Sequence, residues 1–209
     1  YQLFIDQGFN DHRVFCNYGL ILYTQGKHKE AEKFLRKAIE VKSNFAEAHT
    51  NLGNILRTLG KLEEAKICQH KAIELKPNLV DAHFNLGNIL RDLGESEEAA
   101  FSYRKAIELR TDFANAYNNL GAVLNDLDRQ EEAEINYTKA IELKPSFNSA
   151  LRNRWQIFFE KGKFDLALRD SDSCNTKNSR ARSLETLYAL GNIEEIYKRI
   201  EATAEIDSK

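Results

Sequence analysis

The feature that most constrains this chain is a pattern that recurs every 34 residues. Units start in phase at residues 12, 46, 80 and 114, and a weaker unit starts at 148. A period of this length is typical of a helix–turn–helix unit repeated in a solenoid. One such unit cannot bury its apolar faces alone, so the units are expected to stack in sequence order and to share a continuous core.

Small residues recur where two helices of a unit are expected to cross. Gly53 stands in the first helix, Ala65 and Ala72 stand in the second, and Gly60 ends the first helix in the left-handed conformation that glycine adopts at little cost. Asp128 replaces this terminal glycine in the fourth unit. Ser43 takes the place that proline holds in the second unit, where its hydroxyl is predicted to cap a helix. The periodicity therefore predicts paired amphipathic helices throughout.

These units resemble the tetratricopeptide repeat family, whose signature places Leu-Gly, alanine, an aromatic residue, alanine and proline at fixed offsets. The second unit carries this signature in Leu52, Gly53, Ala65, Ala72 and Pro77. The resemblance implies an all-α, right-handed superhelical solenoid of antiparallel helix pairs. The first and last segments also resemble arrays in large bacterial proteins, so the chain is expected to be the repeat region of a longer bacterial protein.

The pattern divides the chain into an array with unusual ends. Arg154 and Trp155 replace Leu-Gly in the fifth unit, which predicts a re-angled pair with a shortened second helix. Terminal units of solenoids are commonly atypical because one face lacks a neighbouring unit. The predicted parts are the end of a preceding repeat at 1–11, units at 12–45, 46–79, 80–113, 114–147 and 148–170, a polar loop at 171–179, and a divergent capping hairpin at 180–209.

Asparagine repeats at the sixth position of the first helix in all five units. The residues are Asn17, Asn51, Asn85, Asn119 and Asn153. Asparagine is about 0.6 kcal/mol less favourable than alanine inside a helix, so the repetition needs a reason. In the repeat family this position faces the concave side, and the set resembles the asparagine ladder of O-linked N-acetylglucosamine transferase. That resemblance implies a grip on a peptide main chain with little sequence preference.

The ladder has a structural alternative and a set of neighbours. Asparagine at this position is also frequent in ordinary repeats of the family, where it bonds only to the next unit. Further along the same helices lie Asn54, Arg57, Asn88 and Arg91, which add candidate peptide contacts or are plain solvated surface residues. Both interpretations stay open at this stage.

Composition and motifs argue against a catalytic or cofactor-binding role for this chain. Net charge is −2 with both signs interspersed, which indicates neither nucleic acid nor anionic membrane as a partner. No signal peptide or spanning segment is recognisable, and the odd, scattered cysteines suggest no zinc site or disulfide, so a cytoplasmic setting is expected. His49 and His83 are one repeat apart and are interpreted as packing residues. We expect no enzyme, no cofactor and no metal.

The sequence therefore predicts a protein–protein interaction scaffold that binds an extended or helical peptide segment of an unidentified protein. The alternative is an accessory domain that delivers substrate to a transferase or oxygenase domain elsewhere in a longer protein. The ends of the array also offer surfaces for self-association.

Overall fold

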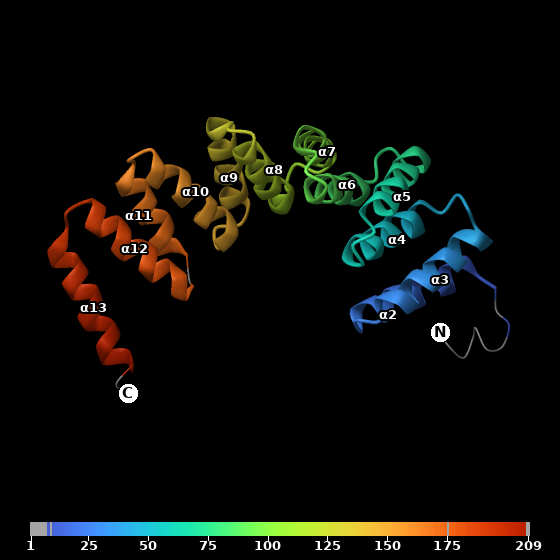
Figure 1. Cartoon of the computed structure of the whole chain (residues 1–209), viewed down its shortest axis with the longest axis horizontal. Coiled ribbons are helices and arrows are strands. Elements are labelled where there is room, and N and C mark those ends of the chain that lie inside the picture. Colours follow the sequence, from blue (N-terminus) through green and yellow to red (C-terminus); the bar gives the residue numbers. More distant parts are fainter. Residues whose placement is uncertain (1–7, 9, 175, 208–209) are drawn as a thin grey trace. The chain divides into compact units, whose positions relative to one another are not determined.

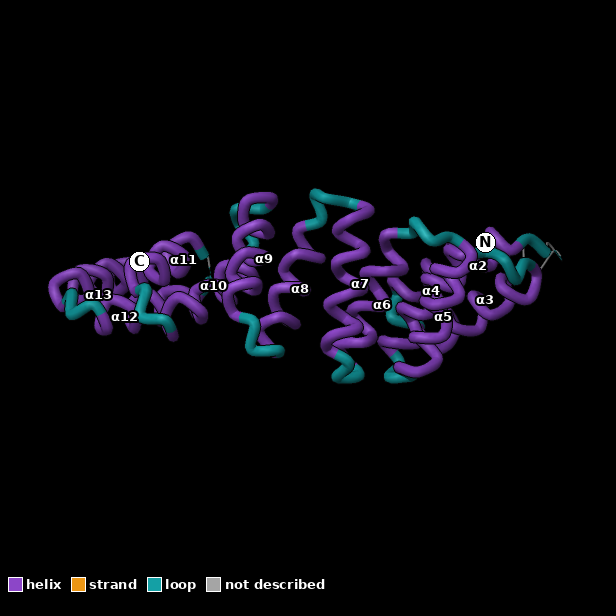
Figure 2. Tube along the Cα trace, turned by 90° about the horizontal axis from the view of Figure 1, so that it is seen from above, coloured by secondary structure: helices purple, strands orange, loops and turns teal. Residues whose placement is uncertain are grey.

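The computed structural model describes residues 8, 10–174 and 176–207, and side chains are described up to residue 200 except that of residue 177. All regular structure in these residues is helical (Figure 2). The first helices of the successive pairs are α2 (His12–Thr24), α4 (Ala46–Thr58), α6 (Val80–Asp92), α8 (Ala114–Asp126), α10 (Asn148–Glu160) and α12 (Lys177–Ala189). The second helices are α3 (His28–Val41), α5 (Leu62–Leu75), α7 (Ser96–Leu109), α9 (Gln130–Leu143), α11 (Phe164–Ser173) and α13 (Ile193–Asp207).

The helices form two compact units, Tyr1–Thr111 and Asp112–Lys209. Within each unit, every first helix packs on its second helix, and the second helix then packs on the first helix of the next pair (Figure 1). Successive first helices also touch, α4 contacting α2 and α6 in one unit, and α8 contacting α10 in the other. The predicted all-α array of stacked helix pairs is confirmed. The segment 1–11, predicted as the end of a preceding repeat, lies mostly outside the described residues.

Each turn inside a pair needs one residue with positive φ. Gly60 supplies it at φ 75°, and Asp128 adopts φ 58° where the fourth pair has no glycine. Aspartate tolerates this conformation better than most residues with a β-carbon, so the turn keeps its shape despite the substitution.

The helix crossing inside a pair depends on the absence of a side chain. A β-carbon built on Gly87 would lie 2.7 Å from Cε1 of Tyr103, and one built on Gly121 would lie 2.7 Å from Cε1 of Tyr137. Both tyrosine rings are buried against the facing helix. The crossing therefore combines glycine on the first helix with a large residue on the second.

The loops between pairs are tied to the following helix by histidine. His49 Nε2 donates to the carbonyl oxygen of Ser43 at 2.9 Å, and His83 Nε2 donates to that of Pro77 at 2.8 Å. Both histidines, predicted as packing residues, thus hydrogen-bond the loop that precedes their helix. The capping role predicted for the Ser43 hydroxyl is wrong, since the N-cap of α4 is Phe45 without a side-chain hydrogen bond.

The fifth pair differs from the others as its sequence suggests. Its second helix α11 has 10 residues, whereas α9 has 14, which confirms the predicted shortening. The predicted polar loop at 171–179 is mostly helical, because α11 runs to Ser173 and α12 starts at Lys177. Thr176 and Ser179 form a reciprocal capping box that starts α12. The Ser173 hydroxyl donates to the carbonyl of Arg169, so this serine satisfies its hydroxyl inside the helix.

Candidate functional site

Three of the predicted asparagines lie on neighbouring first helices of one compact unit. Asn17, Asn51 and Asn85 occupy equivalent positions of α2, α4 and α6. Asn17 is exposed and the other two are half-buried. Packed helices are separated by about 8 to 10 Å, and an extended peptide rises about 3.3 Å per residue. The spacing therefore matches one asparagine to roughly every third residue of a bound strand.

Asn51 makes an internal contact that is weak enough to be exchanged. Its side-chain nitrogen donates to the Sγ atom of Cys16 on the preceding first helix at 3.6 Å. Burial raises the pKa of the Cys16 thiol, so the sulfur stays protonated at neutral pH and is a poor acceptor. A peptide carbonyl would be a stronger acceptor for the same amide. This contact joins neighbouring units, as the alternative interpretation of the ladder requires, although it goes to the preceding unit and not to the next one.

A row of polar links joins the same three helices near their carboxyl ends. Arg57 Nε lies 2.6 Å from Asp92 Oδ2 and ties α4 to α6, while the Tyr23 and Thr58 hydroxyls lie 3.2 Å apart and tie α2 to α4. Arg57 was predicted as a peptide contact, and the structure shows it paired across the repeat. Asp92, Thr58 and Tyr23 were not predicted. The sequence feature that could have identified them is a separation of 35 residues, one repeat period plus one, between two side chains able to bond to each other.

Asn88 belongs to the core and not to the exposed face. Its side chain is 8% exposed, and its oxygen accepts the Tyr103 hydroxyl at 2.8 Å. The prediction of Asn88 as a ligand contact is therefore corrected, because the tyrosine that fills the crossing brings its hydroxyl to this amide. Asn54 and Arg91 remain partly exposed on α4 and α6.

The second unit carries two further asparagines of the predicted set. Asn119 and Asn153 occupy the equivalent positions of α8 and α10, which touch each other, and both are half-buried. The Asn119 oxygen accepts the side-chain amide of Asn118 at 3.1 Å. The structure thus groups the predicted residues as a set of three and a set of two.

The described residues give no support for a metal site or a membrane-spanning helix. No group of three or more His, Cys, Asp or Glu in that part of the chain could hold a metal ion. No helix in the described part of the chain is both long and apolar enough to cross a membrane. Burial raises the pKa of the Cys68 thiol to about 11, so this sulfur is not an activated nucleophile.

Comparison with family models places repeats along most of the array. Models described as tetratricopeptide repeats match residues 46–79, 71–100 and 114–147, and one described as TPR repeat matches 19–60 and 87–128. Together they span residues 19–147. No curated protein sequence matches the chain.

Several solved structures share the fold. The pilF protein of Pseudomonas aeruginosa is 18% identical with a TM-score of 0.80, and the match covers 90% of this chain and 88% of that one. MamA is 24% identical with a TM-score of 0.68, covering 83% and 96%. YrrB, described as a TPR protein with an unusual peptide-binding site, is 23% identical with a TM-score of 0.68, covering 91% and 95%. At these identities the likeness establishes the fold alone.

Proposed function

Because the chain belongs to the tetratricopeptide repeat family, whose members generally serve as protein-interaction scaffolds, we propose that it binds an extended peptide segment of a partner protein on its first-helix face. The observation that supports the proposal is that Asn17, Asn51 and Asn85 occupy equivalent positions on three successive first helices, each of which touches the next. We define these three residues as the asparagine row. Asn119 and Asn153 form a shorter row of the same kind in the second unit.

The chemistry of the row suits a peptide backbone. A carboxamide donates two hydrogen bonds and accepts two, so one side chain can satisfy both the N–H and the C=O of a bound main chain. The amide of Asn51 now points at a sulfur, which a peptide carbonyl would replace with a net gain. Recognition would be mostly independent of peptide sequence, since every residue of the peptide offers the same backbone groups.

The charges around the row favour an uncharged mode of recognition. Arg57, one of the two cations predicted to contact peptide, is paired with Asp92, and each side chain of the pair is only about one-third exposed. A ligand carboxylate would have to displace Asp92. We therefore propose that side-chain charge of the partner contributes little, and that the chain acts by binding in a cytoplasmic setting without catalysis. The role of substrate delivery for a linked enzyme domain stays an alternative that predicts the same binding face.

The test uses peptides selected from a random-sequence display library on the whole chain and then titrated by fluorescence anisotropy. The change is Asn51→Ala with Asn85→Ala, and the control is Asn78→Ala, which removes an exposed loop amide. Each hydrogen bond contributes about 0.5 to 1.5 kcal/mol, so we expect the double variant to weaken binding by about tenfold or more while far-UV circular dichroism is unchanged. The control should bind as the wild type does.

Recognition of the peptide main chain can be tested separately from the role of the asparagines. Scrambling the selected peptide should change its affinity little, whereas methylation of its backbone nitrogens should abolish binding. Affinity that survives loss of both asparagines would refute the proposal, and so would a peptide that tolerates N-methylation throughout.

A further inference from the structure

The last helix of the described chain presents an apolar stripe on its outer side. Ile193, Tyr197 and Ile200 are 54%, 63% and 48% exposed, and their spacing of four and three residues puts them on one face of α13. Leu190, in the turn before the helix, is also exposed and extends this surface. We call Ile193, Tyr197 and Ile200 the terminal stripe. In the earlier pairs of each unit the second helix packs on a following first helix, and α13 is the last helix that the structure describes.

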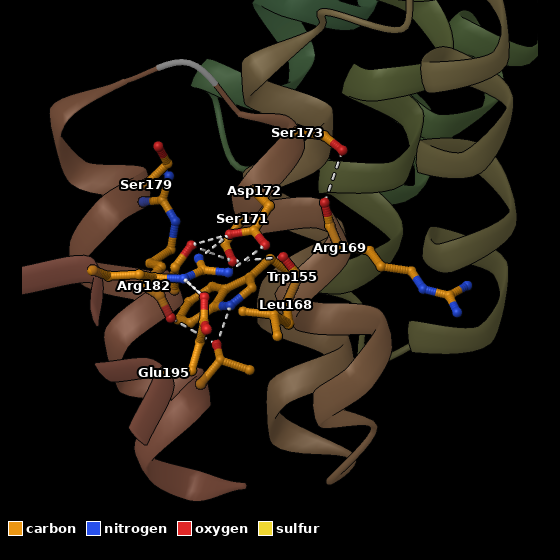
Figure 3. Close-up of polar contacts among 12 residues, drawn as sticks. Trp155, Leu168, Arg169, Ser171, Asp172, Ser173, Ser179, Arg182 and Glu195 are labelled. Carbon is orange, nitrogen blue, oxygen red and sulfur yellow. Dashed lines mark hydrogen bonds and ion pairs between the residues drawn. The ribbon is translucent and has the colours of Figure 1, made fainter. Parts of the chain in front are cut away.

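The orientation of the terminal stripe is held by ion pairs on the other side of α13. Arg199 binds both carboxylate oxygens of Asp172 on α11, at 2.6 and 3.1 Å, and also binds Glu195 at 3.0 Å. Asp172 in turn accepts the Ser183 hydroxyl from α12 at 2.7 Å, within the polar junction drawn in Figure 3. Arg199 reaches α11, and helical spacing puts the terminal stripe on the opposite face of α13, so the stripe faces away from Asp172.

One flank of the terminal stripe carries charges of both signs. Glu194 and Lys198 are one turn apart, largely exposed, and paired with each other at 3.0 Å. When two copies of a helix pair in antiparallel fashion, equivalent flanks of the two helices meet. Glu194 of one copy then faces Lys198 of the other, and the two-fold axis repeats the contact. The stripe and its flank are therefore complementary to themselves.

From this self-complementarity we propose that the terminal stripe docks a second copy of the chain, helix α13 packing antiparallel on α13 about a two-fold axis. The interface is isologous, as is usual for homodimers. It uses one helix from each copy, so it buries less than about 1,200 Å² and gives a weak, concentration-dependent dimer. The asparagine row stays on other helices, so a dimer would present two such rows and gain avidity for a repetitive partner.

The first experiment measures the mass of the whole chain by light scattering over a range of concentrations. The wild type should approach twice its chain mass of 24.0 kDa as concentration rises. Tyr197→Glu places a charge in the stripe and should shift the association midpoint by about tenfold or more. The matched control is Phe101→Glu, a similarly exposed ring on α7, which should leave the midpoint unchanged. A wild type that stays monomeric to about 1 mM overturns the proposal.

The second experiment separates pairing between copies from pairing within a helix. Glu194→Lys and Lys198→Glu each put like charges opposite one another in a symmetric dimer, so each variant alone should associate less than the wild type. An equimolar mixture of the two should recover association, because unlike charges then meet across the interface although both internal pairs remain broken. A mixture no better than its components shows that another surface mediates any dimer. Neither result depends on peptide binding.

Discussion

The fourth and fifth helix pairs lie in the same compact unit and solve the same crossing in opposite ways. In the fourth pair, Gly121 on α8 lets the ring of Tyr137 on α9 lie against the helix. In the fifth pair the equivalent positions hold Trp155 on α10 and Ser171 on α11, both buried and close together (Figure 3). The large and the small residue have exchanged helices. A crossing thus needs one small partner, but the repeat does not require it on a particular side.

The exchange changes how the next pair attaches. Trp155 Nε1 donates to the Thr186 hydroxyl of α12 at 3.0 Å, and Ser171 accepts the Ser183 hydroxyl at 2.9 Å. Next to the tryptophan, Arg154 binds both oxygens of Asp170 at 2.6 and 2.8 Å. In the fourth pair, the residues equivalent to Arg154 and Asp170 are Leu120 and Asn136. The fifth pair therefore joins its neighbour through buried polar groups, whose geometry is more demanding than that of apolar packing.

The largest expected effect comes from breaking the ion pair between Arg154 and Asp170. Arg154→Leu leaves the Asp170 carboxylate, 5% exposed, without its cation, and should lower the free energy of unfolding by about 3 to 5 kcal/mol. Urea unfolding followed by circular dichroism measures the loss. Adding Asp170→Asn recreates the Leu and Asn of the fourth pair, where Asn136 donates to the carbonyl of Glu132. Recovery of most of the loss supports the comparison, and no recovery would contradict it.

An intermediate effect is expected at the glycine of the regular crossing. Gly121→Ala forces Tyr137 away from α8 and should lower the free energy of unfolding by about 1 to 3 kcal/mol, although alanine favours the helix by about 1 kcal/mol. The matched variant is Gly19→Ala, where the new β-carbon would lie 3.1 Å from Cγ of Leu35. Leucine adjusts more easily than a buried ring, so this variant should cost less. Equal losses would show that the tyrosine is not what limits the crossing.

The smallest expected effect is the pH dependence of the polar junction. Burial alone would raise the pKa of Asp172, but hydrogen bonds from Arg199 and Ser183 outweigh it and lower the pKa below its usual range. This carboxylate therefore stabilises the fold above about pH 4, and the contribution is lost as pH falls through the lowered pKa. The group is largely solvent-screened, so the contribution should be under about 1 kcal/mol.

The measurement is the difference in unfolding free energy between the wild type and Asp172→Asn at pH 7 and at pH 3. The difference should shrink at the lower pH. Arg199→Gln should remove the same pH dependence, and the double variant should add nothing further. A difference that is constant with pH would rule out a role for this ion pair.

The candidate site was predicted from the sequence in part. The positions of Asn17, Asn51 and Asn85 on successive first helices follow from the repeat, since residues 34 apart must occupy equivalent places. The burial of Asn88 does not follow from the repeat, because the equivalent Asn54 is partly exposed. Asn88 is buried because it accepts the hydroxyl of Tyr103, the tyrosine that faces Gly87. Likewise, the pairing of Arg57 with Asp92 joins two helices and does not follow from the position of Arg57 in its own helix.

The sequence by itself determined the helix pairs, their order and the amide at each first helix, because glycine, alanine and apolar spacing act within a few residues of the chain. It also marked the fifth pair as irregular through Trp155. The tertiary structure decided how that irregularity is accommodated: which helix of the fifth pair carries the small residue, which carboxylate the half-buried Arg154 binds, and that most of the polar segment 171–179 belongs to α11 and α12. Those outcomes depend on side chains that meet across helices 16 to 31 residues apart, as in the Arg154–Asp170 and Trp155–Thr186 contacts, which local sequence pattern does not encode.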